Sequence, residues 1–282
     1  MQITRTVAEV RAAIAKQRAE KKCIDLVPTM GALHEGHLSL VRTAKTHCGA
    51  VVATIFVNPT QFGPNEDFGK YPRTFDADSA LLEKEGVDVL FAPEAAEIYP
   101  AGASTVVEVA GVSDRLDGVS RPGHFVGVAT VVAKLFNIVQ PDHAFFGQKD
   151  AAQVAVLRRM VRDLHFNLEL IVCPTVREPD GLAMSSRNRY LSPEQRQQAL
   201  VLHRALRRVE AEVAAGVVDS QPLIDAGFAV LADEPEIRVD YFSIVDPETL
   251  EEVSDVTAGA LVAVAAAVGP ARLIDNVVIA PR

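Results

Sequence analysis

The sequence predicts an α/β fold, and three observations lead to this prediction. Strand-like and helix-like segments alternate over the first two thirds of the 282 residues, which is typical of a parallel sheet with helical crossovers. The continuous apolar run 50–57 indicates a strand buried on both faces of such a sheet. After residue 176 two helical segments precede three strands, an order typical of an α+β unit. We therefore predict a Rossmann-like open parallel sheet in a domain 1–176 and a smaller α+β lid domain over 177–282.

Local signals support each element in turn. Periodic apolar residues predict helices over 7–20, 38–47, 75–85, 126–139 and 150–163, and short apolar runs predict strands over 23–27, 50–57, 87–91, 143–146 and 168–173. Ser192 and Pro193 supply an N-cap and a first-turn proline, so a helix is expected from there to about residue 215. A helix over 221–232 and strands over 237–245, 261–268 and 272–279 follow.

Composition and charge limit the possible function. Apolar residues make up 49% and charged residues 23% of the chain, and the formal net charge is −9. This balance argues against a nucleic-acid partner, because phosphate backbones need clustered Lys and Arg. It leaves room for a small anionic ligand. The apolar run 258–268 is shorter than the ~20 residues that span a bilayer, so no membrane partner is expected.

The three cysteines, Cys23, Cys48 and Cys173, lie far apart in the sequence. They fit neither a metal-ligand spacing nor a disulfide framework. We therefore expect reduced thiols and a cytoplasmic location.

The stretch His34-Glu35-Gly36-His37 is the most informative motif. It follows a predicted strand and opens a predicted helix, where unpaired backbone N–H groups can face an anion. Two imidazoles add donors for oxygens that gain charge during phosphoryl or nucleotidyl transfer. The alternative is two unrelated histidines near a helix start, with Glu35 only favouring the helix dipole.

Polar residues also follow other predicted strands. Asn58 and Gln61 suit a small polar substrate, although an Asn-Pro turn with a side-chain cap is the simpler interpretation of Asn58. Lys149 can reach a phosphate, Asp150 can cap a helix or hold a ribose hydroxyl, and Gln153 lies one turn further along the helix. Because ligands bind beyond the carboxyl ends of strands in open α/β sheets, these loops should share one rim.

Three other segments have two possible interpretations each. The loop 182–189 carries Ser and Arg side chains that can clamp a triphosphate, or it is a solvated linker. His124 belongs to a site loop or to a helix-entry turn, and we interpret it as structural. Asp76 and Asp78 compensate a helix dipole or contact a metal.

These motifs, taken in order, resemble the pantoate–β-alanine ligase (pantothenate synthetase) family, within the His-x-Gly-His nucleotidyltransferase superfamily. The resemblance covers essentially the whole chain. The stretches that carry it are 27–37, 56–62, 71–74, 121–125, 145–150, 184–188, 240–241, 245–246 and 272–276.

The resemblance implies an ATP-dependent, AMP-forming ligase that joins pantoate to β-alanine through pantoyl adenylate, with Mg²⁺ beside ATP and a homodimeric assembly. It implies catalytic roles for His34, His37, Lys149 and Arg187, with His37 as a proton donor or as a hydrogen-bond donor to phosphate. It implies pantoate contacts for Gln61 and Gln153, and a β-alanine contact for Gln61. The implied ATP-binding residues are Met30, Gly31, Ala32, Leu33, His34, Glu35, Gly36, His37, Gly147, Gln148, Lys149, Asp150, Val176, Met184, Ser185, Ser186 and Arg187.

Two departures from the usual pattern stand out. Arg187 occupies a position where the superfamily usually carries lysine. The family that this chain resembles generally has arginine there. Ala77 stands where relatives often have an acidic residue, so the protein ligands of Mg²⁺ are left open. Two other functions compete with the ligase: a nucleotidyltransferase that stops at an adenylated product, and a nucleotide-binding regulator without turnover.

Overall fold

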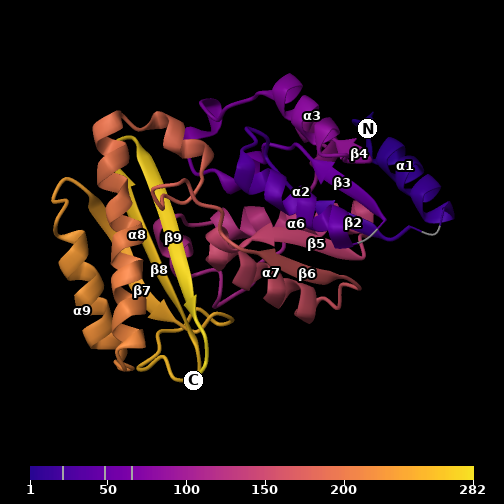
Figure 1. Cartoon of the computed structure of the whole chain (residues 1–282). Helices are drawn as coiled ribbons and strands as arrows, with labels where there is room; N and C mark the ends of the chain where they lie inside the picture. The colour runs from indigo at the N-terminus through magenta and orange to yellow at the C-terminus, as the bar shows by residue number, and fades with distance from the viewer. Residues whose placement is uncertain (21, 48, 65) are drawn as a thin grey trace.

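The chain forms two separate sheets in the computed structural model, which describes residues 1–20, 22–47, 49–64 and 66–282 (Figure 1). The first sheet has six parallel strands in the order β1-β4-β3-β2-β5-β6. Its strands are β1 (Gln2–Thr4), β2 (Ile24–Val27), β3 (Ala50–Thr54), β4 (Val89–Phe91), β5 (His143–Gly147) and β6 (Glu169–Cys173). The strand order reverses between β2 and β5, which makes the crevice above their carboxyl ends the expected ligand site.

Helices cover both faces of this sheet. On one face α1 (Val7–Ala19), α6 (His124–Val139) and α7 (Ala151–Asp163) enclose the largest apolar core. On the other face α2 (Glu35–His47) and α3 (Phe75–Lys84) enclose a second, smaller core. The shorter helices are α4 (Ala95–Ile98), α5 (Asp117–Ser120), η1 (Pro59–Gln61), η2 (Asp67–Gly69), η3 (Gln148–Asp150) and η4 (Ser186–Tyr190).

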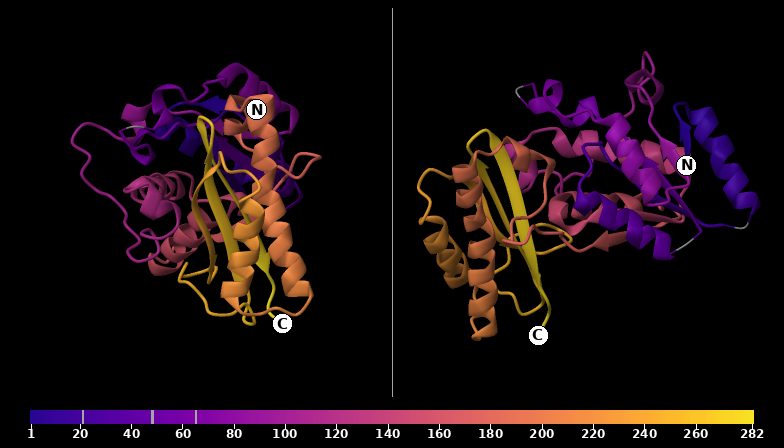
Figure 2. Two further views of the ribbon diagram at one scale, coloured as in Figure 1. Left: turned by 90° about the vertical axis from the view of Figure 1, so that its left-hand side faces the viewer. Right: turned by 45° about the horizontal axis from the view of Figure 1, so that its top comes forward.

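The carboxyl-terminal part is a three-stranded antiparallel sheet, β7-β8-β9, packed against two helices. Its elements are α8 (Pro193–Ala214), α9 (Ser220–Leu231), β7 (Arg238–Val245), β8 (Ala260–Val268) and β9 (Ala271–Ile279). Ser192 and Gln195 form a capping box that starts α8. Both helices lie at the end of the molecule away from the six-stranded sheet (Figures 1 and 2, right).

The predicted fold class is confirmed, and most element boundaries agree within a few residues. Helix α2 begins three residues before the predicted Leu38, because its first turn contains most of the His-Glu-Gly-His motif. Strand β3 ends at Thr54 rather than at residue 57. Strand β1 and the one-turn helices are absent from the prediction, since segments of three or four residues carry no usable periodicity. The boundary between residues 176 and 177 stays a prediction.

The cysteines follow the expectation only in part. Cys173 is buried and has a free thiol. Cys23 is disulfide-bonded, so the prediction of reduced thiols is wrong for this residue. Cys48 lies outside the described residues. Within the described part of the chain, no helix has the length and apolar character needed to cross a membrane.

Candidate active site

The loop after β2 is held by buried hydrogen bonds. Gly31 and Ala32 both adopt left-handed backbone angles, with φ of 81° and 51°, and glycine at the first position accepts this at little cost. The Asp78 carboxylate accepts the N–H groups of Ala32 and Leu33, each at 2.9 Å, and Asp78 is only 2% exposed. Thr74 Oγ1 donates to the same carboxylate at 3.0 Å. Asp78 is therefore a loop anchor, which neither sequence interpretation of this residue included.

The two imidazoles of the motif stand side by side at the start of α2. Their ring centroids are 4.2 Å apart. His34 Nδ1 accepts the Gly36 N–H at 3.2 Å, and His37 Nδ1 accepts the His34 N–H at 3.3 Å. A neutral imidazole with an accepting Nδ1 carries its proton on Nε2. Each ring therefore offers one Nε2–H donor.

Burial keeps both rings neutral. Burial, followed by repulsion from Lys149, lowers the pKa of His34 to about 4. Burial, followed by repulsion from His34, lowers the pKa of His37 to about 3. At neutral pH both side chains are therefore uncharged hydrogen-bond donors, not acids ready to release a proton.

Gly36 is required by the packing of these rings. A Cβ at this position would lie 2.9 Å from Cε1 and 3.0 Å from Nδ1 of His34, and 3.9 Å from Cβ of Met184. A side chain here would force the His34 imidazole to shift. Met184 belongs to the loop before η4, so that loop reaches the start of α2.

The turn after β5 brings a cation to the same rim. Lys149 Nζ donates to Asp150 Oδ1 at 3.2 Å. Burial alone would raise the pKa of Asp150, but the charge and hydrogen bond of Lys149, and to a lesser extent the charge of Arg187, hold it below its ordinary value. The Asp150 carboxylate therefore stays charged and pairs with Lys149. Asp150 is the N-cap residue of α7, but its side chain makes no capping hydrogen bond.

The turn 148–149 is held from the carboxyl-terminal sheet. Asn276 of β9 donates through Nδ2 to the carbonyl oxygens of Gln148 and Lys149, at 3.0 and 2.9 Å. Its Oδ1 accepts the Gln148 side chain at 3.0 Å. The Gln148 side chain thus contacts Asn276. Asn276 belongs to the family-like stretch 272–276, but no sequence pattern assigns it this role.

Arg187, in η4, contacts a residue of η2 in the amino-terminal half of the chain. Its guanidinium makes a bidentate pair with the Asp67 carboxylate, at 3.2 and 3.1 Å. Ser185 Oγ accepts the Arg187 N–H at 3.2 Å and so caps η4. Val176 accepts the Met184 N–H at 3.0 Å through its carbonyl oxygen, which fixes the base of this loop. Asp67 gives no signal in the sequence that links it to Arg187.

Gln61 borders a small cavity between the loop after β2, the end of β3 and α6. Its side chain contacts Asn58 Nδ2 at 3.1 Å and Met30 Sδ at 2.9 Å. Asn58 is 1% exposed and accepts the Tyr99 hydroxyl at 2.8 Å, so the simpler interpretation of Asn58 as a structural cap fits its contacts. Behind Gln61 the cavity has a volume of about 160 Å³. Its lining includes Met30, His37, Gln61, Val131, Asp150 and Gln153.

The Gln61 backbone is also fixed. His124 Nδ1 and Arg121 Nη2 donate to the Gln61 carbonyl oxygen, at 2.8 and 3.2 Å. Arg121 pairs in turn with Glu66. His124 therefore supports the loop that carries Gln61, in agreement with its structural interpretation.

A larger cavity of about 1030 Å³ continues from the small one toward the carboxyl-terminal sheet. Asp150 and Gln153 line both cavities. Lys149, Ser185 and Arg187 line the larger one. Carboxylate–cation pairs surround it: Glu66 with Arg121, Asp67 with Arg187, Asp117 with Arg272, Asp150 with Lys149 and Asp275 with Arg177.

These ion pairs determine whether carboxylates of the larger cavity are available to bind Mg²⁺. Each carboxylate that lines the larger cavity already has a Lys or Arg partner. Among the described residues, no group of three or more metal-ligating side chains gathers at this cleft. Ala77 is exposed on the first turn of α3. The side chains therefore provide no dedicated Mg²⁺ site, and a metal here would be held mainly by phosphate oxygens and water.

Several of the predicted ATP-binding residues do not line either cavity with their side chains. Ala32 and Leu33 are buried, and their N–H groups are taken by Asp78. Glu35 is exposed and pairs with Arg42. His37, Lys149 and Arg187 line the two adjoining cavities, and His34 packs against His37.

Comparison with known proteins identifies the family of the chain. The family model described as pantoate-beta-alanine ligase matches residues 2–278. A pantothenate synthetase from Acidobacterium capsulatum is 65% identical over 99% of this chain and 97% of its own length. The crystal structure of the pantothenate synthetase from Thermus thermophilus superposes with a TM-score of 0.95 at 51% identity, with all of both chains covered.

A more distant relative was solved with ligands. The pantoate-beta-alanine ligase from Francisella tularensis, 33% identical over 98% of this chain and 97% of that one, has a TM-score of 0.80. Its structure is described as a complex with beta-gamma ATP and beta-alanine. With the family match over nearly its full length, and with these relatives, the chain belongs to the pantoate–β-alanine ligase family of enzymes.

Proposed function

We propose that the chain joins pantoate and β-alanine to form pantothenate, using ATP and releasing AMP and pyrophosphate, through a pantoyl-adenylate intermediate. One observation carries the proposal: the neutral His37 imidazole, an ammonium group and a guanidinium group from three separate segments line two adjoining cavities, and the neutral His34 imidazole packs against His37. The ATP and β-alanine named for the Francisella tularensis relative support the substrate class.

Adenylation needs charge stabilisation more than covalent catalysis. A pantoate carboxylate oxygen attacks the α-phosphorus of ATP, and the bond to the leaving pyrophosphate breaks with its electron pair. Nε2–H groups of His34 and His37 would donate to phosphate oxygens as their charge grows. Lys149 and Arg187 would neutralise the leaving pyrophosphate. The neutral rings favour hydrogen bonding over proton donation for His37.

The ligation step needs a dry pocket. The β-alanine amine attacks the acyl carbon, the bond to AMP breaks with its electron pair, and the amine loses a proton. Valine and phenylalanine side chains line much of the small cavity, and this surface suits the two methyl groups of pantoate while excluding water that would hydrolyse the mixed anhydride. Gln61 would bind pantoate and β-alanine, and Gln153 would bind pantoate.

The remaining features rest on the family resemblance. Mg²⁺ would accompany ATP and supply charge neutralisation of its phosphates, held as argued above. A homodimer and a cytoplasmic location stay predictions. Light scattering of the purified chain tests the dimer, since a mass near the 30.3 kDa of one chain would contradict it.

One combined assay separates the ligase from its two alternatives. Pyrophosphate exchange into ATP should depend on pantoate, and AMP should appear only when β-alanine is also present. Exchange without β-alanine-dependent AMP would indicate a transferase that stops at the adenylate. ATP binding without product under any substrate pair would indicate a regulator.

The role of His37 can be tested in the same assay. His37→Ala should slow pyrophosphate exchange into ATP by about 10²-fold or more, because a donor to the developing charge is lost. The free energy of unfolding, measured in urea, should change much less. His37→Gln keeps an N–H donor but cannot release a proton. A Gln variant clearly faster than the Ala variant supports hydrogen bonding, and equal loss in both supports proton transfer. An unchanged rate in both would remove His37 from the mechanism.

A further inference from the structure

A second cluster of ligating side chains lies at the opposite end of the strands from the cleft. Asp25 is on β2, His143 is the first residue of β5, and His47 is the last residue of α2. Asp25 and His143 are register partners on adjacent strands. The active-site turn follows the other end of β5, four residues and about 13 Å further along the strand. The cluster is therefore separate from the cleft.

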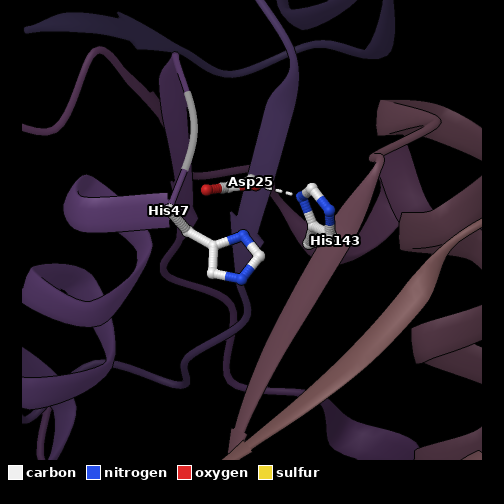
Figure 3. Close-up of side chains that lie close together, drawn as sticks. All are labelled: Asp25, His47 and His143. Carbon is white, nitrogen blue, oxygen red and sulfur yellow. Dashed lines mark hydrogen bonds and ion pairs between the residues drawn. The ribbon is translucent and has the colours of Figure 1, made fainter.

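The three side chains converge closely. One ligand atom from each lies within 4.8 Å of the others. His143 Nδ1 is 2.8 Å from Asp25 Oδ1. The rings of His47 and His143 meet edge to face, with centroids 4.6 Å apart. Figure 3 shows both imidazoles beside the Asp25 carboxylate.

Asp25 supplies an independent sign of a missing ligand. Its side chain is fully buried, with 0% exposure. Within the described residues 1–20, 22–47, 49–64 and 66–282, its Oδ2 atom has no hydrogen-bond partner. A buried carboxylate oxygen without a donor is costly. A cation bound between the two histidines would satisfy it.

We propose that Asp25, His47 and His143 form a binding site for a transition-metal dication of the Zn²⁺ type. Two imidazole nitrogens and one carboxylate oxygen suit such an ion, whereas Mg²⁺ and Ca²⁺ prefer all-oxygen ligands. Ligands around tetrahedral zinc at about 2.0–2.1 Å lie about 3.3 Å apart. The exposed ring of His47, at the end of its helix, can close the remaining distance. Water would fill the fourth position.

The ion would be a structural link. It would join the carboxyl end of α2 to the amino ends of β2 and β5, next to the Asp25–His143 contact that already connects the two strands. Helix α2 carries His37 in its first turn, at its other end. Metal binding at His47 would therefore fix the end of this helix that the active-site loop does not hold.

Calorimetric titration of Zn²⁺ into the tag-free, chelator-treated full chain tests the proposal. One ion should bind per chain, and the melting temperature should rise with added Zn²⁺. His47→Ala should weaken binding by about tenfold or more and abolish the rise. His47 is exposed, so this variant should keep the far-ultraviolet circular dichroism of the parent.

Two control variants locate the ion. His165→Asn changes another exposed histidine, and asparagine tolerates its left-handed φ of 52°; this variant should bind Zn²⁺ as the parent does. His34→Asn removes an imidazole of the nucleotide cleft and should also bind normally. The proposal is overturned if the parent binds no Zn²⁺, if His47→Ala binds as tightly as the parent, or if His34→Asn is the variant that loses the ion.

Discussion

The anchoring of the loop after β2 by Asp78 gives the sharpest prediction. In Asp78→Asn one carboxylate oxygen becomes an NH₂ group of nearly the same size. The carboxylate now accepts from the N–H groups of Ala32 and Leu33 and from Thr74 Oγ1. The amide has one oxygen for these donors, so a backbone N–H would face another donor. Shape is conserved, and only the hydrogen bonding changes.

The expected cost follows from these contacts. Asp78, Ala32 and Leu33 are 2%, 1% and 8% exposed, so water does not replace the lost acceptor. An unsatisfied buried N–H costs about 1–3 kcal/mol, and a bond to a neutral oxygen is about 1 kcal/mol weaker than one to a charged oxygen. We expect the free energy of unfolding to fall by about 2–4 kcal/mol. The ATP KM should rise as well, because the left-handed turn at Gly31 and Ala32 loses its anchor.

Urea unfolding followed by circular dichroism measures the loss of stability. Asp76→Asn is the matched control, since Asp76 lies two residues earlier on the same helix turn, carries the same charge and is exposed. It should change stability by no more than about 0.5 kcal/mol. Equal effects of the two substitutions would mean that Asp78 acts only through the helix dipole, and the anchoring argument would be refuted.

Three other changes test the site. Gly36→Ala should slow pantoate-dependent pyrophosphate exchange at least about tenfold through displacement of His34, with unfolding free energy unchanged or raised by up to about 1 kcal/mol; normal exchange would show that the close contact is relieved without effect. The pKa of His37 is about 3 in the folded chain and about 6.5 in the unfolded chain, so the unfolded state takes up the proton first and acid destabilises the fold. His37→Gln should therefore lose about 2 kcal/mol less stability than the parent between pH 7 and 5 in urea titrations at both values. Asn276→Ala removes three hydrogen bonds to the turn 148–149 and should lower stability by about 2–3 kcal/mol and the exchange rate with it; a rate unaffected by this loss would separate the turn from catalysis.

The fold could be predicted because its signals are local. Continuous apolar runs such as 50–57 and periodic ones such as 126–139 report burial directly. Strand β1 escaped prediction because its three residues, Gln2–Thr4, are held mainly by pairing with β4. The disulfide of Cys23 was not predicted for a related reason, because the separation of two cysteines in the sequence does not give their separation in space.

The site could be predicted only where chemistry and position coincide in one loop. His34, His37 and Lys149 each follow a strand and carry a donor, so the sequence pointed to them. Asp78 and Asn276 were missed as anchors because the backbone groups that they hold are 45 or more and 127 or more residues away. Such contacts between side chain and backbone have no sequence pattern of their own.

The pairing of cations at the cleft has a consequence for substrate selection. Arg187 is held by Asp67 in a bidentate pair, with side chains 29% and 26% exposed. An incoming anion binds the Arg187 guanidinium only if it interacts with Arg187 more strongly than Asp67 does. Displacing Asp67 leaves a half-buried carboxylate without its partner, and this is costly. A triphosphate has the charge and the geometry for bidentate binding, whereas a single carboxylate offers no advantage over Asp67. The same exchange applies to Lys149 and Asp150. If Lys149 and Arg187 bind ATP as proposed, the carboxylates that pair with them would compete with incoming anions, and weakly charged anions would gain no advantage at these positions.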